Sequence, residues 1–422
     1  MRRFALALAV SVGCPLLGCA PAGAPTAPNV VILLADDLGW NNVGYHDGNI
    51  ATPRIDQFAA ESLVLDRFYV TPVCASTRAG LLTGRYPHRV GVPFLPDEPQ
   101  LVAVKLSPDA RLMGDWLSEA GYGRRALIGK WGLGKSHPLT RGFTQFYGLL
   151  GGSVGYFTHR SPQGDHDWHR DRSLSHAPGY ATDLIADESV AFIAADHAAP
   201  FLLFVAFNAP HVPLQAKPEV LAALGARPDL IAPFMYREDE AENAVLYAAM
   251  VMTLDTAIGR ILDAIDGAGL RDDTLVLFAS DNGALGRIGS RDNAPLRGHK
   301  NSLFEGGIRV PAVIRWPGRL APGRSSALAA FIDVVPTLIQ AAGGEPGAEA
   351  FDGISLIDVL AGNAKAEDRT LFLTPTAAVS SRWKLIDGEL YDLSLDPGET
   401  QDVAAENPGI ARRLEQELAR LR

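Results

Sequence analysis

Cysteine is scarce in this 422-residue chain, which contains only Cys14, Cys19 and Cys74. The first two lie in or beside an N-terminal targeting segment, so Cys74 would stand alone in the mature domain. A lone cysteine excludes an intramolecular disulfide. In an oxidising compartment, an unpaired thiol is either a buried, inert side chain or a residue that is kept for its chemistry.

Basic residues are also in deficit: 38 Lys and Arg stand against 48 Asp and Glu, a formal net charge of −10. An acidic protein is repelled by phosphate backbones, so no nucleic-acid partner is expected. An anion site can still be built locally from Lys, Arg and backbone N–H groups. With 47% hydrophobic and 20% charged residues, the chain can bury a substantial core and is typical of a globular protein.

The apolar run near the N-terminus, residues 4–12, is too short to span a bilayer and follows two Arg, as in a signal peptide. Leu16-Leu17-Gly18-Cys19 then resembles the lipobox of bacterial lipoproteins. We therefore expect a lipoprotein signal peptide over residues 1–18 and a Pro/Ala tether over residues 19–28. The alternative is an ordinary signal peptide with Cys19 as a bystander. Lipidation of Cys19 predicts an exported cell-envelope protein held at a membrane, periplasm-facing or in the outer membrane of a Gram-negative cell.

Short apolar runs alternate with helical patterns along the next 300 or so residues. Alternation of this kind predicts an α/β domain with a largely parallel sheet covered by helices on both faces. The predicted strands are 30–35, 126–129, 201–207, 275–279 and 310–314, and the predicted helices are 111–120, 181–196 and 240–268.

The pattern of predicted elements changes after about residue 345. Three strand-like pieces, at 370–373, 383–386 and 390–393, precede a closing helix over about 408–421. They predict a small antiparallel sheet with one helix, packed against the main domain. We therefore expect a catalytic domain over residues 29–345 and a C-terminal subdomain over residues 346–422.

Charged and polar side chains follow four of the predicted strands. In parallel α/β sheets ligands bind beyond the carboxyl ends of the strands, so these side chains predict a site at that edge. Asp or Asn close to Gly also commonly forms a turn. A turn is therefore the alternative interpretation for Asp36-Asp37 or Asp281-Asn282 taken alone. The residues at the four strand ends are Asp36 and Asp37, Lys130, His211, and Asp281 and Asn282.

The lone Cys74 lies four residues before Arg78, in a segment that ends with Leu82-Thr83-Gly84-Arg85. Ser76 or Thr77 can cap a helix over roughly residues 78–82. Cys74 would then lie just before a helix N-terminus, where the helix dipole and Arg78 both favour negative charge on the thiol. This is the environment of a reactive cysteine.

Several other stretches accompany the Cys74 segment in a fixed order along almost the whole mature chain. Together they resemble the formylglycine-dependent, arylsulfatase-like sulfatase family, whose fold is of the alkaline-phosphatase type. The stretches are LADDLGW (34–40), CASTR (74–78), LTGR (82–85), IGKWGLG (128–134), APHVP (209–213), SDNG (280–283), RGHK (297–300), EGGIRVP (305–311) and LYDL (390–393).

This resemblance implies a sulfuric ester hydrolase that cleaves an aryl or carbohydrate sulfate monoester. It implies that a maturation enzyme oxidises Cys74 to formylglycine, and that one hydroxyl of the aldehyde hydrate attacks sulfur. The second hydroxyl then expels sulfate, a step that an ordinary Ser or Cys cannot perform. Hard oxygen ligands suit Ca²⁺ or Mg²⁺. The implied metal ligands are Asp36, Asp37, Asp281, Asn282 and residue 74.

The resemblance also implies roles for four cationic or titratable side chains. Arg78 would hold the aldehyde hydrate. Lys130 and Lys300 would neutralise the sulfate oxygens in the transition state. His211 would protonate the departing alcohol.

Two positions depart from the family pattern. Ser76 stands where Pro is usual, which bears on recognition of Cys74 by the maturation enzyme. Gly132 stands where many members have a His that contacts the aldehyde hydrate; Asp281 or His137 could replace it. A sulfatase-like protein that binds glycans without catalysis is therefore one alternative. A phosphate or phosphonate monoesterase with the same nucleophile and metal is the other.

The segment Asp165-His166-Asp167-Trp168-His169-Arg170 contains several metal-binding residue types. Its mixed spacing gives no closing ligand set for a second metal. We expect a substrate-pocket loop in which Trp168 is available to stack on a sugar or aryl group.

Overall fold

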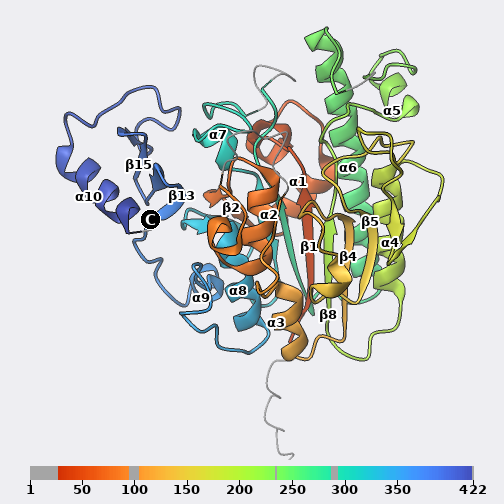
Figure 1. Cartoon of the computed structure of the whole chain (residues 1–422), viewed down its shortest axis with the longest axis horizontal. Coiled ribbons are helices and arrows are strands. Elements are labelled where there is room, and N and C mark those ends of the chain that lie inside the picture. The colour runs from red at the N-terminus through yellow and green to blue at the C-terminus, as the bar shows by residue number, and fades with distance from the viewer. Residues whose placement is uncertain (1–26, 95–103, 233–234, 287–292, 421–422) are drawn as a thin grey trace, which may run out of the picture.

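The computed structural model describes residues 27–94, 104–232, 235–286 and 293–420. Most of the expected targeting segment and tether, including Cys14 and Cys19, lies outside these ranges. Within the described residues, the main architectural feature is a ten-stranded mixed sheet with helices on both faces (Figure 1). In sheet order, its strands are β11 (Gly323–Ser325), β2 (Leu63–Leu65), β10 (Ala312–Arg315), β9 (Thr274–Ser280), β1 (Asn29–Ala35), β8 (Phe201–Ala206), β4 (Arg124–Lys130), β5 (Gln145–Leu149), β6 (His169–Arg170) and β7 (Ser173–Leu174).

Strand β1 occupies the middle of the sheet, parallel to β8 on one side and to β9 on the other. Its side chains are apolar without alternation because each face of the sheet packs against a separate core. Val30, Ile32 and Leu34 join one core, and the intervening residues join the other. The predicted parallel sheet is therefore confirmed.

Two features of the sheet differ from the sequence-based expectation. The segment predicted as strand 310–314 forms β10 but runs antiparallel to β9. Among its described residues, the connection over residues 281–311 contains only the four-residue helix α7 (Glu305–Ile308), and not the long crossover helix that joins parallel strands. Strand β5 was not predicted. Its five residues, Gln145–Leu149, include two polar or flexible positions and carry little hydrophobic signal.

Helices cover the two faces of the sheet in separate groups. The predicted helices are observed as α3, α4 and α6. One face carries α2 (Cys74–Thr83), α3 (Met113–Glu119) and α8 (Val334–Ala341), and the other carries α1 (Pro53–Ala60), α4 (Ala181–Ala194) and α6 (Glu240–Gly267). Three short helices, α5 (Pro218–Ala223), α7 (Glu305–Ile308) and α9 (Ile357–Leu360), lie in connections.

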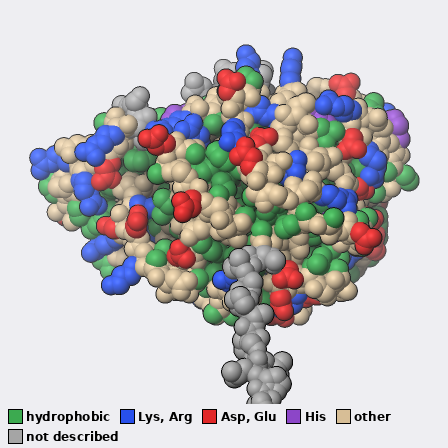
Figure 2. Space-filling view, turned by 90° about the horizontal axis from the view of Figure 1, so that it is seen from below, with side chains coloured by type: hydrophobic (Ala, Val, Ile, Leu, Met, Phe, Trp, Pro, Cys, Tyr) green, Lys and Arg blue, Asp and Glu red, His purple; other side chains and the backbone are tan. Residues whose placement is uncertain are grey.

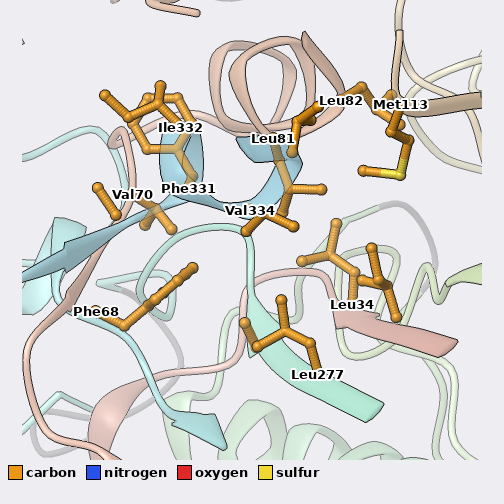
Figure 3. Close-up of a cluster of buried hydrophobic side chains, with 14 of the residues drawn as sticks. Leu34, Phe68, Val70, Leu81, Leu82, Met113, Leu277, Phe331, Ile332 and Val334 are labelled. Atoms are coloured by element: carbon orange, nitrogen blue, oxygen red, sulfur yellow. The ribbon is translucent and has the colours of Figure 1, made fainter. Parts of the chain in front are cut away.

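Helix α2 is fixed to the sheet by its apolar side chains. Leu81 and Leu82 are buried in the same core as Leu34 of β1 and Leu277 of β9, as Figure 3 shows. Packing of this kind holds a helix rigidly, because interiors have few voids. The N-terminal turn of α2 is therefore held at a fixed position relative to the sheet.

Helix α6 is long and apolar enough to cross a membrane by length and composition alone. In this fold, 72% of its most apolar 18-residue window is buried. Its apolar surface packs on α1, α4 and the sheet, so α6 is a core helix of the domain.

The C-terminal region forms the predicted small antiparallel sheet. Its strands are β13 (Leu371–Thr374), β14 (Ala377–Val379), β15 (Trp383–Ile386) and β16 (Glu389–Asp392), and α10 (Pro408–Ala419) covers one face. Strand β14 was not predicted. The other face of the sheet joins the main core through side chains such as Ile386 and Tyr391. Viewed from below, acidic and basic side chains are interspersed over the surface (Figure 2).

The loop after β1 contains a half-buried histidine, His46, whose titration affects stability. The His46 ring stacks on Trp40, with centroids 3.7 Å apart, and its Nδ1 lies 3.2 Å from the Trp40 carbonyl oxygen. Burial lowers the pKa of His46 to about 3. The unfolded chain, with a His pKa of about 6.5, therefore binds a proton that the folded protein rejects. Stability from this group is present above pH 6.5 and is lost as the pH falls toward 3.

We expect this protein to lose about 1–2 kcal/mol more stability between pH 7 and pH 4.5 than its His46→Gln variant. Urea unfolding of both proteins at both pH values measures the difference. Because the lost stacking on Trp40 affects both pH values alike, the difference isolates the proton. Identical pH dependence in the two proteins would show that His46 does not resist protonation.

Candidate active site

The strand-end residues predicted from sequence meet in one place. Asp36 and Asp37 follow β1, Lys130 ends β4, and Asp281 and Asn282 follow β9. All five side chains are buried. Asp37 has a left-handed backbone, with φ of 70°, which Asp tolerates better than most residues. Because this conformation interrupts the strand alternation, the adjacent Asp36 and Asp37 side chains both contribute to the site.

The first half of the site is a network around Arg78. Its Nε and Nη2 each lie 2.9 Å from Asp281 Oδ2, and its Nη2 lies 3.6 Å from Asp36 Oδ2. Its Nη1 donates to the Lys130 carbonyl oxygen at 3.0 Å. The Lys130 ammonium pairs with Asp36 Oδ2. Arg78 therefore ties the ends of β1, β4 and β9 to helix α2.

The second half of the site is built around Asp37. Its Oδ1 accepts from Lys300 Nζ at 2.6 Å and from Asn282 Nδ2 at 2.7 Å. Its Oδ2 lies 3.8 Å from His211 Nε2. His211 follows β8, and its Nδ1 lies 2.7 Å from the Val212 carbonyl oxygen, which leaves Nε2 directed at the site.

Helix α2 begins at Cys74 itself, with Val73 as its N-cap residue, which corrects the predicted start at residue 78. The two residues expected to cap the helix have other partners. Ser76 Oγ donates to the carbonyl oxygens of Pro93 and Phe94, and Thr77 Oγ1 accepts from the Thr71 N–H. Half-buried Cys74 therefore lies in the first turn, where the free backbone N–H groups of the helix favour negative charge.

The charges in this pocket are balanced. Three carboxylates, on Asp36, Asp37 and Asp281, face three cations, on Arg78, Lys130 and Lys300. Burial opposes ionisation of Asp36, but Lys130 and its cationic neighbours outweigh it and hold the pKa of Asp36 below its usual range. Burial and the nearby Asp36 raise the pKa of Asp281 to about 7.

The oxygen atoms left over in this network fit a hard divalent cation. Asp36 Oδ1, Asp37 Oδ2 and Asn282 Oδ1 are buried and have no hydrogen-bond partner among the described residues. A buried oxygen without a partner is costly unless a ligand occupies it. Ligand atoms of Asp36, Cys74 and Asp281 also lie within 4.8 Å of one another. Carboxylate and amide oxygens of this kind are the donors that Ca²⁺ and Mg²⁺ use.

Gly132 brings the backbone close to two cations of the site. A Cβ added there would lie 3.3 Å from Lys130 Cε and 3.6 Å from Arg78 Cδ, and the backbone φ is 68°. A side chain at this position therefore points at both cations. With Gly in place of the usual His, no side chain from this position contacts them.

We expect Gly132→Ala to cost about 1 kcal/mol for the left-handed backbone and to lower turnover about tenfold by displacing Lys130. Gly121→Ala is a matched control, because Gly121 has a φ of 88° and nothing within 4 Å of an added Cβ. Melting temperatures and kcat/KM of both variants give the comparison. Equal kinetics in the two variants would place position 132 outside the reacting region.

Two other residues considered from sequence are occupied elsewhere. His137 caps a short turn by accepting from the Leu139 N–H at 3.2 Å, and its Nε2 lies 3.0 Å from the Asp171 carbonyl oxygen. Both of its ring nitrogens are thus used locally.

The expectation that Trp168 is free to stack on a substrate is wrong: its side chain is fully buried and stacks on His159. Trp168 is a core residue because it follows a chain reversal that turns it toward β5.

Several residues that shape the site were not predicted. Ser280 Oγ accepts from the Leu38 N–H and donates to the Asn282 carbonyl oxygen, at 3.0 and 2.8 Å. Tyr247 of α6 donates to the Asp37 carbonyl oxygen, and Tyr156 donates to those of Asn208 and His211. Ser280 adjoins a predicted ligand and could have been found. The two tyrosines lie in unrelated segments and leave no local signal.

The chain matches the sulfatase family over residues 28–344. It is 31% identical to N-acetylgalactosamine-6-sulfatase of Mus musculus, covering 84% of this chain and 70% of the relative. It is 30% identical to arylsulfatase A of Homo sapiens, covering 92% and 86%. Among solved structures, Ps i-CgsB in complex with k-i-k-neocarrahexaose has a TM-score of 0.80 and 30% identity, covering 93% of both chains.

A second solved structure, the PsFucS1 sulfatase from Pseudoalteromonas sp., has a TM-score of 0.75 and 26% identity, covering 93% of this chain and 90% of the other. The agreement in fold confirms the alkaline-phosphatase-like architecture expected from the sequence. Since the family match covers most of the chain, the protein belongs to the formylglycine-dependent sulfatase family and is a sulfuric ester hydrolase of carbohydrate or aryl sulfate esters.

Proposed function

We propose that this protein is a metal-dependent sulfatase of sulfated carbohydrates whose nucleophile is formylglycine made from Cys74. The observation that supports it most directly is the position of Cys74. Its Sγ lies at the first turn of α2, close to the Asp36 and Asp281 carboxylates. The aldehyde hydrate would supply a hydroxyl for attack on sulfur and a second one for release of sulfate.

Asp36, Asp37, Asp281 and Asn282 would hold Ca²⁺ or Mg²⁺, together with residue 74. A bound divalent cation would polarise the sulfate oxygens and favour ionisation of the attacking hydroxyl. Because three carboxylates face three cations in the pocket, a bound divalent cation would leave the site with a net positive charge, which favours binding of an anionic ester.

The cationic side chains have separate tasks in the proposed reaction. Arg78 is held by two carboxylates at the base of α2 and orients residue 74. Lys130 and Lys300 enter from opposite halves of the site and neutralise the sulfate oxygens as negative charge moves during bond cleavage. Both ammonium groups are buried, so their charges act in a medium of low dielectric constant.

His211 is the proposed general acid. Its Nδ1 is engaged by the Val212 carbonyl oxygen, so Nε2 is the nitrogen that exchanges a proton with the leaving alcohol. Burial, followed by the nearby Lys300, lowers the pKa of His211 to about 4. A sulfate group beside the ring raises that pKa, because an anion favours the imidazolium form. Substrate binding therefore promotes protonation of Nε2.

Two of the similar proteins support a carbohydrate substrate. One is an N-acetylgalactosamine-6-sulfatase, and one solved structure contains k-i-k-neocarrahexaose. Assays with sulfated mono- and oligosaccharides, in parallel with an aryl sulfate, test this class. Preferred turnover of aryl phosphate or phosphonate would instead favour a phosphate or phosphonate monoesterase. Binding of sulfated glycans without turnover would favour a non-catalytic protein.

Mass spectrometry of residue 74 tests the nucleophile. Trypsin is expected to release residues 68–78 from protein made in a host that has formylglycine-generating machinery. An aldehyde at position 74 supports the mechanism. An unmodified thiol, with a control sulfatase fully converted in the same cells, would indicate that Ser76 blocks maturation. A Ser76→Pro variant then shows whether conversion is restored.

We also propose that the protein is an envelope lipoprotein, as the Leu16-Leu17-Gly18-Cys19 sequence indicates. Labelling with a fatty-acid analogue in a bacterial host is expected to mark the wild type but not Cys19→Ser. Equal labelling of the two would remove the proposed anchor.

A further inference from the structure

A buried cluster of three charged side chains joins the C-terminal sheet to helix α7. Lys384 of β15 lies with its Nζ 3.0 Å from Glu305 Oε1 and 2.7 Å from Glu399 Oε1. All three side chains are fully buried. Glu305 is the first residue of α7, which lies between the two sheets (Figure 1).

The cluster is closely hydrogen-bonded. Glu305 Oε2 accepts from the Tyr69 hydroxyl at 2.9 Å, and Glu399 Oε2 accepts from the Glu305 N–H at 2.6 Å. Burial raises the pKa of Glu305, but Lys384 and Arg309 reverse this effect and keep its carboxylate ionised. A buried charge cluster is seldom more stabilising than apolar side chains of the same volume. Stability alone is therefore a weak explanation for it.

Helix α7 contacts the backbone that carries two of the site residues. Gly283 is the residue after Asn282, and its N–H donates to the Gly307 carbonyl oxygen of α7 at 3.0 Å. The Lys300 N–H donates to the Ala284 carbonyl oxygen at 3.0 Å. The approach is so close that a Cβ on Gly283 would lie 1.8 Å from the Gly306 carbonyl oxygen. Any shift of α7 is therefore transmitted to Asn282 and Lys300.

A second connection runs between the same two parts of the chain. Arg297 Nη1 donates to the Glu399 carbonyl oxygen at 2.7 Å, and the Gly306 N–H donates to the Arg297 carbonyl oxygen at 2.7 Å. Residue 297 begins the segment that leads to Lys300. Glu399 thus contacts α7 through its side chain and the Lys300 segment through its backbone.

We propose that Lys384, Glu305 and Glu399 are positioning residues that set the place of Lys300 and Asn282 through helix α7. The C-terminal sheet is then a functional part of the site, although it contributes no side chain to it. The kinetic part of this inference rests on the proposed function. The mechanical part, the ordering of residues 282–284 and 297–300, does not.

The test compares Lys384→Met with Arg369→Met. Arg369 also ties the C-terminal region to the main domain, through a part-buried pair with Asp333 (Nη1 to Oδ1, 2.8 Å), but no described contact joins that pair to α7. Glu399→Gln is a milder variant that keeps the shape of the cluster and leaves Lys384 one carboxylate. It serves if Lys384→Met does not fold.

Hydrogen exchange resolved at the Gly283 and Lys300 amides is the first readout. We expect at least tenfold faster exchange of both amides in Lys384→Met or Glu399→Gln, and no change there in Arg369→Met at equal loss of melting temperature. With a sulfate ester, kcat is expected to fall about 10- to 100-fold in the cluster variants only, as when the supporting contacts of a site are removed.

Unchanged exchange at Gly283 and Lys300 in the cluster variants would overturn the proposal, as would equal changes in Arg369→Met. If the wild type hydrolyses no sulfate ester, the proposed function fails, and the exchange measurement still decides whether the cluster orders the Lys300 segment.

Discussion

Cys74→Ala is expected to reduce turnover of a sulfate ester by on the order of 10⁴-fold or more, because it removes the proposed nucleophile. The fold should survive. Cys74 is half-buried at the start of α2, while the packing of this helix depends on Leu81 and Leu82 and its electrostatic contacts on Arg78. The measurement is kcat/KM beside the melting temperature.

Thr83→Ser is a suitable control for Cys74→Ala. It alters the other end of the same helix and keeps the hydroxyl that donates to the Ala79 carbonyl oxygen. Wild-type turnover is expected in this control. Substantial residual activity in Cys74→Ala, with contamination excluded, would show that another group attacks the ester.

Asp36→Asn is expected to lower Ca²⁺ affinity at least 100-fold and to abolish turnover. One Asp36 oxygen is buried without a partner, so it is free for a cation, and the other pairs with Lys130. The substitution removes the charge that a cation needs and leaves Lys130 buried beside a neutral amide. Breaking a buried pair in this way costs about 3–5 kcal/mol. Calorimetric titration with Ca²⁺ and urea unfolding measure the two effects.

Asp333→Asn separates stability from cation binding. Asp333 is a buried carboxylate paired with Arg369, far in sequence from the strand-end ligands. We expect a comparable stability loss with unchanged Ca²⁺ affinity. Chelator treatment of the wild type should reproduce the activity loss of Asp36→Asn, and added Ca²⁺ or Mg²⁺ should reverse it. Full activity in chelator would refute a metal-dependent reaction.

The parallel centre of the fold could be predicted from the sequence because parallel strands that are buried on both faces appear as continuous runs of apolar residues. Strands β1, β8 and β9 are runs of mostly apolar residues, and a polar side chain follows each within two residues. Strand β5 was not predicted because its five residues carry little hydrophobic signal. The antiparallel direction of β10 could not be predicted either, because the direction of pairing depends on the path of the connection and not on composition. Division of the chain at residue 345 stays a prediction.

The residues of the site were predictable where they follow strands or lie in recognisable motifs. The structure brings Asp36, Asp37, Lys130, His211 and Lys300 together as expected. What could not be predicted is how the residues are held. Tyr247 reaches Asp37 from a helix more than 200 positions away in the sequence. The wrong expectation for Trp168 has the same origin, since burial depends on how a loop folds back.

Strand β1 crosses the sheet from Asn29 to Ala35, so Asp36 and Asp37 lie at the end of the strand opposite to the one where the chain enters. Seven extended residues span roughly 23 Å, so the start of β1 lies about that far from the carboxylates of the site. A lipid on Cys19, as proposed above, would attach the enzyme through the end of β1 that lies opposite the pocket. With the anchor at that end, a long polymer would be able to enter the pocket from the side opposite the lipid.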